Sequence, residues 1–201
     1  GGRVYAAALV KQNDTEVYVC AFHADTGALL WKRFLCSAPA TGGGGWQGLP
    51  WMPRPIPCVA ESGGIVYCLT NIGAVAALHG AGGSVLWLAR YPADNAAGFD
   101  GQRLAARPAN PPVVSGNQLV ILPQDASKFF VLDARSGEIE VSSGTPDLQY
   151  FLGVHPTDKP RWRTAVFVGK SVHCYILDPL PPPDPGRPEP RRRWPRAIRE
   201  R

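Results

Sequence analysis

The chain has 201 residues, of which 45% are apolar and 18% are charged, and this composition excludes an intrinsically disordered protein. Its 22 glycines and 21 prolines favour many short strands and turns over long helices. Most of the net charge of +5 lies in residues 179–201, so the nearly neutral remainder argues against a nucleic-acid partner. No apolar run reaches the roughly 18 residues of a membrane-spanning helix.

The first predicted unit, roughly residues 1–36, is composed of three antiparallel strands separated by polar turns. We expect these strands at 3–10, 16–22 and 28–34. In the second turn, HADTG, Asp25 can accept bonds from backbone N–H groups further along the chain, and Gly27 can adopt the left-handed conformation of a short hairpin. Trp31 follows on the next strand, and we expect its ring to pack between neighbouring sheets.

Two further units, roughly 55–92 and 111–142, place a short Pro-led strand in front of the same pattern. We expect strands at 57–60, 65–70, 74–78 and 84–91, and at 111–114, 117–122, 129–133 and 138–141. A fourth unit, roughly 162–178, supplies only part of the pattern. The Pro- and Arg-rich residues 179–201 are then predicted to be a disordered tail, which could contact an anionic partner or remain solvated.

The units repeat at a nearly constant interval along the sequence. The same two intervals relate the members of three sets of residues: Phe22, Leu78 and Leu132; Gly27, Gly83 and Gly137; and Trp31, Trp87 and Val141. Such a period indicates repeated supersecondary units, and four strands in about 55 residues is typical of a propeller blade. The sequence therefore predicts an all-β fold, a partial β-propeller of four-stranded antiparallel blades with three blades and a partial fourth.

Three segments resemble the repeat of the pyrroloquinoline quinone (PQQ)-like β-propeller family: AFHADTGALLWKRF, ALHGAGGSVLWLARY and VLDARSGEIEV. In that repeat a strand ends near Leu-Asp-Ala, a Thr-Gly or Ser-Gly turn follows, and an apolar strand closes on tryptophan. The matching structural residues are Asp25, Thr26, Gly27 and Trp31; Gly83 and Trp87; and Asp133, Ser136 and Gly137. The second copy lacks the Asp-Thr pair, and the third has Val141 in place of tryptophan.

The resemblance covers about residues 1–178 and implies one of two kinds of protein. Some members are alcohol or sugar dehydrogenases that hold the quinone and a calcium ion in the central funnel, and others are non-catalytic. Many work outside the cytoplasm, which implies a periplasmic, cell-envelope or extracellular location. Because three units and a partial fourth are few for a closed ring, the remainder of a larger propeller is an expected partner.

No catalytic, metal-binding or cofactor-binding residue is predicted. The family's alcohol dehydrogenases carry two adjacent cysteines over the quinone, whereas the five cysteines here are never adjacent and form no CxxC motif. They are interpreted as buried free thiols, with a Cys58–Cys68 disulfide as the alternative. Asp94, Asp100 and Asp125 are scattered in or near connections and suggest no calcium site.

The places left for function are three long connections, 37–54, 92–110 and 142–161. Their aromatic and arginine side chains suit a protein interface, although the same side chains could pack the connections onto the blades. The candidate interaction residues are Trp46, Trp51, Arg54, Phe99, Arg103 and Arg107. The main hypothesis is therefore a non-catalytic scaffold or protein-interaction propeller with an unidentified protein partner. The alternatives are a fragment of a PQQ-dependent quinoprotein dehydrogenase and a ligand- or carbohydrate-sensing propeller.

Overall fold

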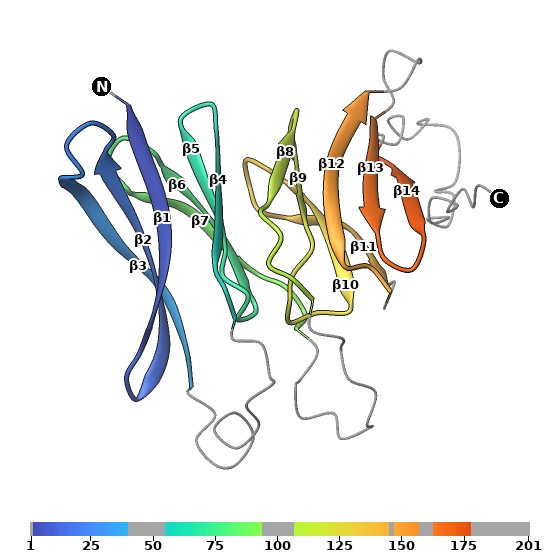
Figure 1. Ribbon diagram of the computed structural model, residues 1–201, viewed down its shortest axis with the longest axis horizontal. Helices are drawn as coiled ribbons and strands as arrows, with labels where there is room; N and C mark the ends of the chain where they lie inside the picture. Colours follow the sequence, from blue (N-terminus) through green and yellow to red (C-terminus); the bar gives the residue numbers. More distant parts are fainter. Residues whose placement is uncertain (1, 40–54, 94–106, 145–146, 157–162, 178–201) are drawn as a thin grey trace, which may run out of the picture. The chain divides into compact units, whose positions relative to one another are not determined.

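The computed structural model describes residues 2–39, 55–93, 107–144, 147–156 and 163–177. In these ranges the chain forms antiparallel strands grouped into four sheets of three or four strands, which confirms the predicted all-β fold class (Figure 1). None of the described segments is a helix with the length and apolarity needed to cross a membrane. The chain divides into two compact units, Gly1–Pro146 and Asp147–Arg201, which are described separately.

The first unit contains three sheets, each built from strands that are consecutive in the chain. Sheet A has the order β1 (Arg3–Lys11), β2 (Asp14–His23) and β3 (Leu29–Pro39). Sheet B has the order β4 (Cys58–Ser62), β5 (Ile65–Leu69), β6 (Ala74–His79) and β7 (Val85–Arg90). Sheet C has the order β8 (Val113–Ser115), β9 (Gln118–Ile121), β10 (Lys128–Asp133) and β11 (Ile139–Gly144). Short local connections between neighbouring strands make each sheet an independent meander.

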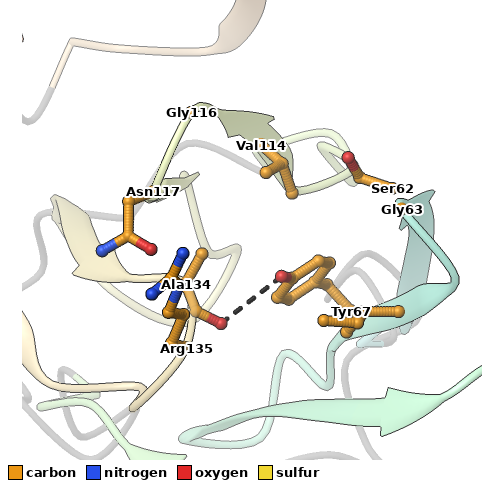
Figure 2. Close-up of a pocket in the computed structure, with 9 residues that line it drawn as sticks. Ser62, Gly63, Tyr67, Val114, Gly116, Asn117, Ala134 and Arg135 are labelled. Atoms are coloured by element: carbon orange, nitrogen blue, oxygen red, sulfur yellow. Dashed lines mark hydrogen bonds between the residues drawn. The ribbon is translucent and has the colours of Figure 1, made fainter.

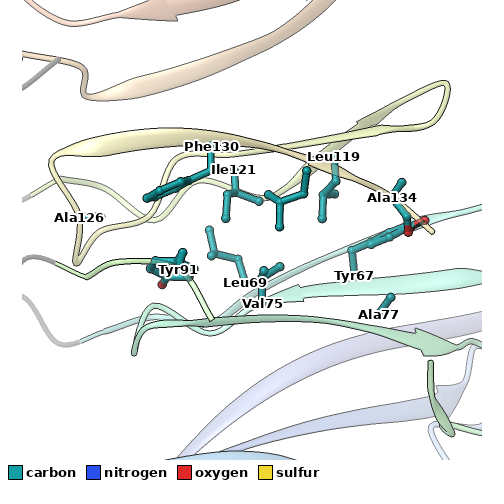
Figure 3. Close-up of a cluster of buried hydrophobic side chains, with 11 residues drawn as sticks. Tyr67, Leu69, Val75, Ala77, Tyr91, Leu119, Ile121, Ala126, Phe130 and Ala134 are labelled. Carbon is teal, nitrogen blue, oxygen red and sulfur yellow. Dashed lines mark hydrogen bonds between the residues drawn. The ribbon is translucent and has the colours of Figure 1, made fainter. Parts of the chain in front are cut away.

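Sheet B packs between sheets A and C, so both of its faces are buried. Side chains alternate along a strand: Val66 and Cys68 contact sheet A, whereas Tyr67 and Leu69 contact sheet C. Figure 3 shows the cluster that sheet B forms with sheet C. Burial on both faces explains why β5 and β6 are continuous apolar runs, because each fully buried large side chain stabilises the fold by about 1.5–3 kcal/mol.

The second unit contains sheet D. Its strands are β12 (Tyr150–Pro156), β13 (Arg163–Val168) and β14 (Val172–Ile176), in that order. Phe151 stacks on Phe167 with ring centroids 4.7 Å apart, and Tyr175 meets Phe167 edge-on. The prediction that 142–161 is a connection and that the fourth unit starts near 162 was wrong, because β12 lies inside that range. A β-bulge between Phe151 and Gly153 interrupts the alternation by which the strand could have been found.

All five cysteines are free, so the structure does not contain the alternative disulfide between Cys58 and Cys68. Cys68 is completely buried between sheets A and B, and this burial raises the pKa of its thiol. We expect the native protein to leave Cys68 unmodified by a thiol reagent at pH 8, because the thiolate is the reactive form. Titration of native and urea-unfolded protein tests this expectation. Loss of a fast-reacting thiol in Cys68→Ser would contradict it.

Candidate functional site

Three hairpin turns of the first unit have the same backbone structure. They are His23–Ala28 in sheet A, His79–Ser84 in sheet B and Asp133–Glu138 in sheet C. In each, the glycine near the end has a left-handed φ, of 69°, 68° and 76°, and donates its N–H to the carbonyl of the first turn residue at 2.7–2.9 Å. A β-carbon is disfavoured at this φ, so the conformation requires the repeated glycine.

Each of the last two turns binds a tryptophan from the preceding sheet. A Cβ on Gly83 would lie 2.6 Å from two ring carbons of Trp31, and a Cβ on Gly137 would lie equally close to Trp87. The indole N–H of Trp31 donates to the Gly80 carbonyl at 3.0 Å, and that of Trp87 donates to the Ala134 carbonyl at 3.1 Å. We call these two segments the indole-binding turns. The repeated tryptophan therefore joins its own sheet to the next one.

A tyrosine accompanies each tryptophan, and this residue was missed in the sequence. Tyr5 lies 5.9 Å from Trp31 between ring centroids, and its hydroxyl donates to the same Gly80 carbonyl at 3.2 Å. Tyr67 pairs with Trp87 in the same way, with a bond of 3.4 Å to Ala134. The two tyrosines are further apart in the sequence than the two tryptophans are, so a constant period does not find them.

In two of the turns, the side chain of the first turn residue accepts hydrogen bonds from backbone N–H groups further along the chain. The sequence had predicted this role for Asp25, two positions later. The Asp133 carboxylate accepts bonds from the backbone N–H groups of Arg135 and Ser136, and the Ser136 bond is the main reason that its pKa lies below the usual range. In sheet A the equivalent residue is His23, whose Nδ1 accepts from the Asp25 N–H at 3.3 Å. The Ala28 N–H donates to the Thr26 hydroxyl, and among the described residues no backbone N–H donates to the Asp25 carboxylate, which lies 3.9 Å from the His23 Nδ1. The prediction that Asp25 forms the forward bonds was therefore wrong.

A pocket of about 270 Å³ lies between sheets B and C at this end of the unit (Figure 2). The turns at Gly63 and Gly116 border it, and Tyr67 reaches across it to the Ala134 carbonyl. The other polar lining groups come from Ser62, Asn117 and Arg135. The pocket therefore gathers polar groups from three turns, whereas the Tyr67 ring itself is 3% exposed.

A buried polar network connects sheets B and C at their other end. Asn71, in the turn after β5, donates to the Ile56 carbonyl at 2.6 Å and accepts from the Gln124 N–H at 3.0 Å. Asp125 accepts from the Gly73 N–H and from the Tyr91 hydroxyl, both at 2.7 Å. Burial, followed by the Asp125 charge, raises the pKa of Tyr91 well above its ordinary value. These bonds satisfy buried polar groups and fix two hairpins against each other.

Arg107 belongs to this network and not to an exposed interaction loop. Its side chain is 5% exposed, and the guanidinium donates to the carbonyls of Pro123 and Ala126. The prediction that Arg107 contacts a partner is therefore corrected, because the contact is made within the chain. The other candidate interaction residues and the predicted tail of residues 179–201 lie outside the described residues; the former are Trp46, Trp51, Arg54, Phe99 and Arg103.

Two edge strands at equivalent positions of successive sheets expose large apolar side chains. Strands β3 and β7 are each the last strand of their sheet. Their side chains are 43–56% exposed at Leu29, Leu30, Val85, Leu86 and Leu88. Among the described residues, no three His, Cys, Asp or Glu side chains group as a metal site would require. The clearest surface features of this unit are thus the apolar edge and the pocket.

Comparison with solved structures defines the class of fold. BamB from Moraxella catarrhalis matches with a TM-score of 0.50 and 17% identity over 83% of this chain and 46% of that chain. Sqt1 from Saccharomyces cerevisiae matches with a TM-score of 0.52 and 14% identity over 86% and 45%. The quinohemoprotein alcohol dehydrogenase ADHIIG from Pseudomonas putida HK5 has a TM-score of 0.48 and 14% identity over 84% and 31%. No protein-family model and no curated protein matches the sequence.

The described sheets are therefore blades of a β-propeller, in the partial arrangement that the sequence predicted. BamB has the PQQ-like form of this fold, which agrees with the resemblance of the repeats. The chain spans less than half the length of BamB and of Sqt1. At these identities the likeness concerns the fold alone.

Proposed function

We propose that the chain is a non-catalytic β-propeller module that binds a protein partner. The observation that carries this proposal is the apolar edge of β3 and β7, defined above. An edge strand presents unpaired backbone groups, and proteins usually protect such edges with charge or proline. Here the charged residues Lys32, Arg33 and Arg90 lie further along the two strands, and each strand begins with exposed leucine or valine. These apolar side chains suit a partner surface that buries them. The predicted envelope or extracellular location is part of this proposal.

The experiment compares the full chain with a variant that carries Leu30→Asp and Leu86→Asp. Both side chains are exposed, so the variant is expected to fold, while charge at the two positions prevents burial in an interface. The matched control carries Leu152→Asp and Val172→Asp, which replace exposed apolar residues of sheet D. Partners are isolated from the source organism with the immobilised chain, and their affinity is measured with the purified proteins.

We expect the edge variant to lower the affinity of a specific partner by at least about tenfold, which corresponds to about 1.4 kcal/mol. The sheet D variant is expected to bind like the unmodified chain. Equal binding by the edge variant to every partner would refute the proposed edge interface. Circular dichroism of both variants shows whether the sheets are intact.

The pocket between sheets B and C supports a second candidate function, which is the binding of a small polar ligand such as a carbohydrate. The Ser62 hydroxyl and the Arg135 guanidinium line the pocket and offer hydrogen-bond donors. A glycan array probed with the full chain tests this function, with Arg135→Ala as the variant expected to lose any signal. An array without specific binding would reject it. No observation on the described residues favours the dehydrogenase alternative.

A further inference from the structure

The hydrogen bonds of strand β7 show which of its residues form the free edge of sheet B. The Tyr91 N–H donates to the Gly73 carbonyl at 3.1 Å, and the register of β6 and β7 places these two residues opposite each other. Along an antiparallel pair, residues alternate between bonding to the opposite strand and pointing their backbone groups away from it. Ala89 is therefore bonded to β6, whereas the N–H and C=O groups of Leu88 and Arg90 point outward.

A bond on the other side of β6 supports this assignment. Ala74 lies opposite Arg90, and its carbonyl accepts from the Thr70 N–H, which follows β5, at 3.0 Å. Strand β7 is the last strand of sheet B, so no described strand pairs with the outward groups of Leu88 and Arg90. These four backbone groups are available to a strand from another molecule.

The available stretch of the edge is short because both of its ends are protected. The next outward position after Arg90 is Pro92, which has no N–H group to donate. Before Leu88 the pairing with β6 shifts its register at a β-bulge that contains Leu86. Bulges and prolines prevent strand pairing at sheet edges. Only the segment Leu88–Arg90 therefore remains open to a regular added strand.

The side chains of this segment define the chemistry of the partner. Leu88 and Arg90 lie on the same face of the strand, and both are exposed. No described carboxylate forms an ion pair with Arg90. Strands β3 and β7 carry three cationic side chains and no acidic one, the other two cations being Lys32 and Arg33. The open segment thus offers one apolar and one cationic side chain beside its backbone groups.

The equivalent edge of sheet A is less available. Lys32 and Phe34 follow the tryptophan of β3 as Leu88 and Arg90 follow that of β7. The Lys32 ammonium lies 4.2 Å from the centroid of the Tyr18 ring, and the Phe34 ring meets Tyr18 edge-on. Within the described part of the chain, Leu88 and Arg90 make no such aromatic contact. Strand β7 is therefore the edge whose side chains a partner can use.

We propose that a protein partner adds a short antiparallel strand to β7, with an acidic residue opposite Arg90 and an apolar residue opposite Leu88. This inference rests on the proposed protein-binding function and specifies its partner. Opposite residues of antiparallel strands share one face, so the partner segment reads acidic–x–apolar from its N-terminal side. Its backbone bonds provide affinity, and the two side chains provide specificity.

The test adds the synthetic peptide STETVTS to the isotope-labelled full chain and follows amide hydrogen exchange by NMR. With peptide at roughly ten times its dissociation constant, the Leu88 and Arg90 amides are expected to exchange about tenfold more slowly, because only the unbound chain exchanges. The Trp87 and Ala89 amides are expected to keep their rates, since they already bond to β6. Contact through side chains alone would not produce this alternation.

Two controls isolate the backbone bonds and the charge. Methylation of the backbone nitrogens of the peptide's glutamate and valine keeps both side chains but removes two donors, and it is expected to weaken binding at least about tenfold. Arg90→Glu is expected to weaken binding of STETVTS and to favour STKTVTS, in which lysine replaces glutamate. The matched variant Lys11→Glu, at an exposed cation of β1, is expected to bind STETVTS like the unmodified chain.

Three results would overturn the inference: no protection of the Leu88 and Arg90 amides at millimolar peptide, equal binding of the methylated peptide, or a dimer without peptide in which these amides are protected. The last, detected by sedimentation, would assign the edge to a second copy of the chain. The proposed function is tested separately, by the affinity of the edge variant for isolated partners. A partner that binds the edge variant weakly but leaves both amides unprotected would refute this inference alone.

Discussion

Gly83→Ala is expected to destabilise the protein by about 2–5 kcal/mol, whereas the same change at Gly27 is expected to cost about 1–2 kcal/mol. Both glycines have a φ near 70°, so alanine is strained by a similar amount at either position. Only at Gly83 does the new methyl group meet the Trp31 ring, at 2.6 Å. The ring must then move, and it loses its bond to the Gly80 carbonyl. The difference between the two variants isolates the contact between the blades.

Urea unfolding of the two variants and of Gly137→Ala measures these values. Gly137→Ala is expected to resemble Gly83→Ala, because Trp87 lies equally close. Combining Gly83→Ala with Trp31→Ala is expected to cost less than the sum of the single changes, since the clash is then absent. Equal losses at all three glycines would show that the indoles do not lie on these turns.

Asn71→Ala is expected to destabilise the protein by about 3–5 kcal/mol, the second large effect. Asn71 is 2% exposed, and its removal leaves the Gln124 N–H without its bond and the Ile56 carbonyl with only the weak donor of the Cys58 thiol at 3.5 Å, each at a cost of about 1–3 kcal/mol. Its φ of 57° adds strain for alanine that asparagine tolerates better. The loss is larger than that of an ordinary surface turn because the side chain is buried and bonds two segments that are remote in the sequence.

Two matched variants separate the causes. Asn71→Gly removes the strain and retains only the loss of the bonds, so it is expected to be more stable than Asn71→Ala. Asn71→Asp keeps an acceptor for Gln124 but cannot donate to Ile56, and its ionised group would be buried at a position that is 2% exposed. It is therefore expected to be less stable than Asn71→Gly near neutral pH. Denaturant unfolding gives the order. If Asn71→Ala lowered the free energy of unfolding by less than about 0.5 kcal/mol, as a typical surface substitution does, the buried polar network would not stabilise the fold as described.

The sequence predicted the blades because their determinants are local and repeat along the chain. Within each unit the strands, the turn glycine and the tryptophan position keep the same spacing. Trp31 and Trp87 were therefore found together with Gly83 and Gly137. Tyr5 and Tyr67 were missed because the longer first hairpin changes their spacing. β12 was missed because the bulge at Gly153 disrupts its pattern.

The polar network could not be predicted because its partners are remote in the sequence and follow no period. Asn71 and Gln124, for example, are 53 residues apart, and the packing of two hairpins alone brings them together. Arg107 illustrates the consequence. As a residue type it suits an exposed interface, but the folded chain gives it two internal carbonyl partners. Function was the least predictable property. The repeat motif maintains the fold and carries no information about a ligand. The apolar edge and the pocket are defined by which side chains remain exposed after folding, and the sequence alone does not show this.

The most direct test of this account is a nuclear Overhauser measurement on the full chain, between the indole protons and the α-protons of the turn glycines. The account predicts one set of cross-peaks between Trp31 and Gly83 and a second between Trp87 and Gly137, because ring and turn are in contact in both cases. Cross-peaks from either indole only to residues of its own sheet would contradict the packing of blades through tryptophan.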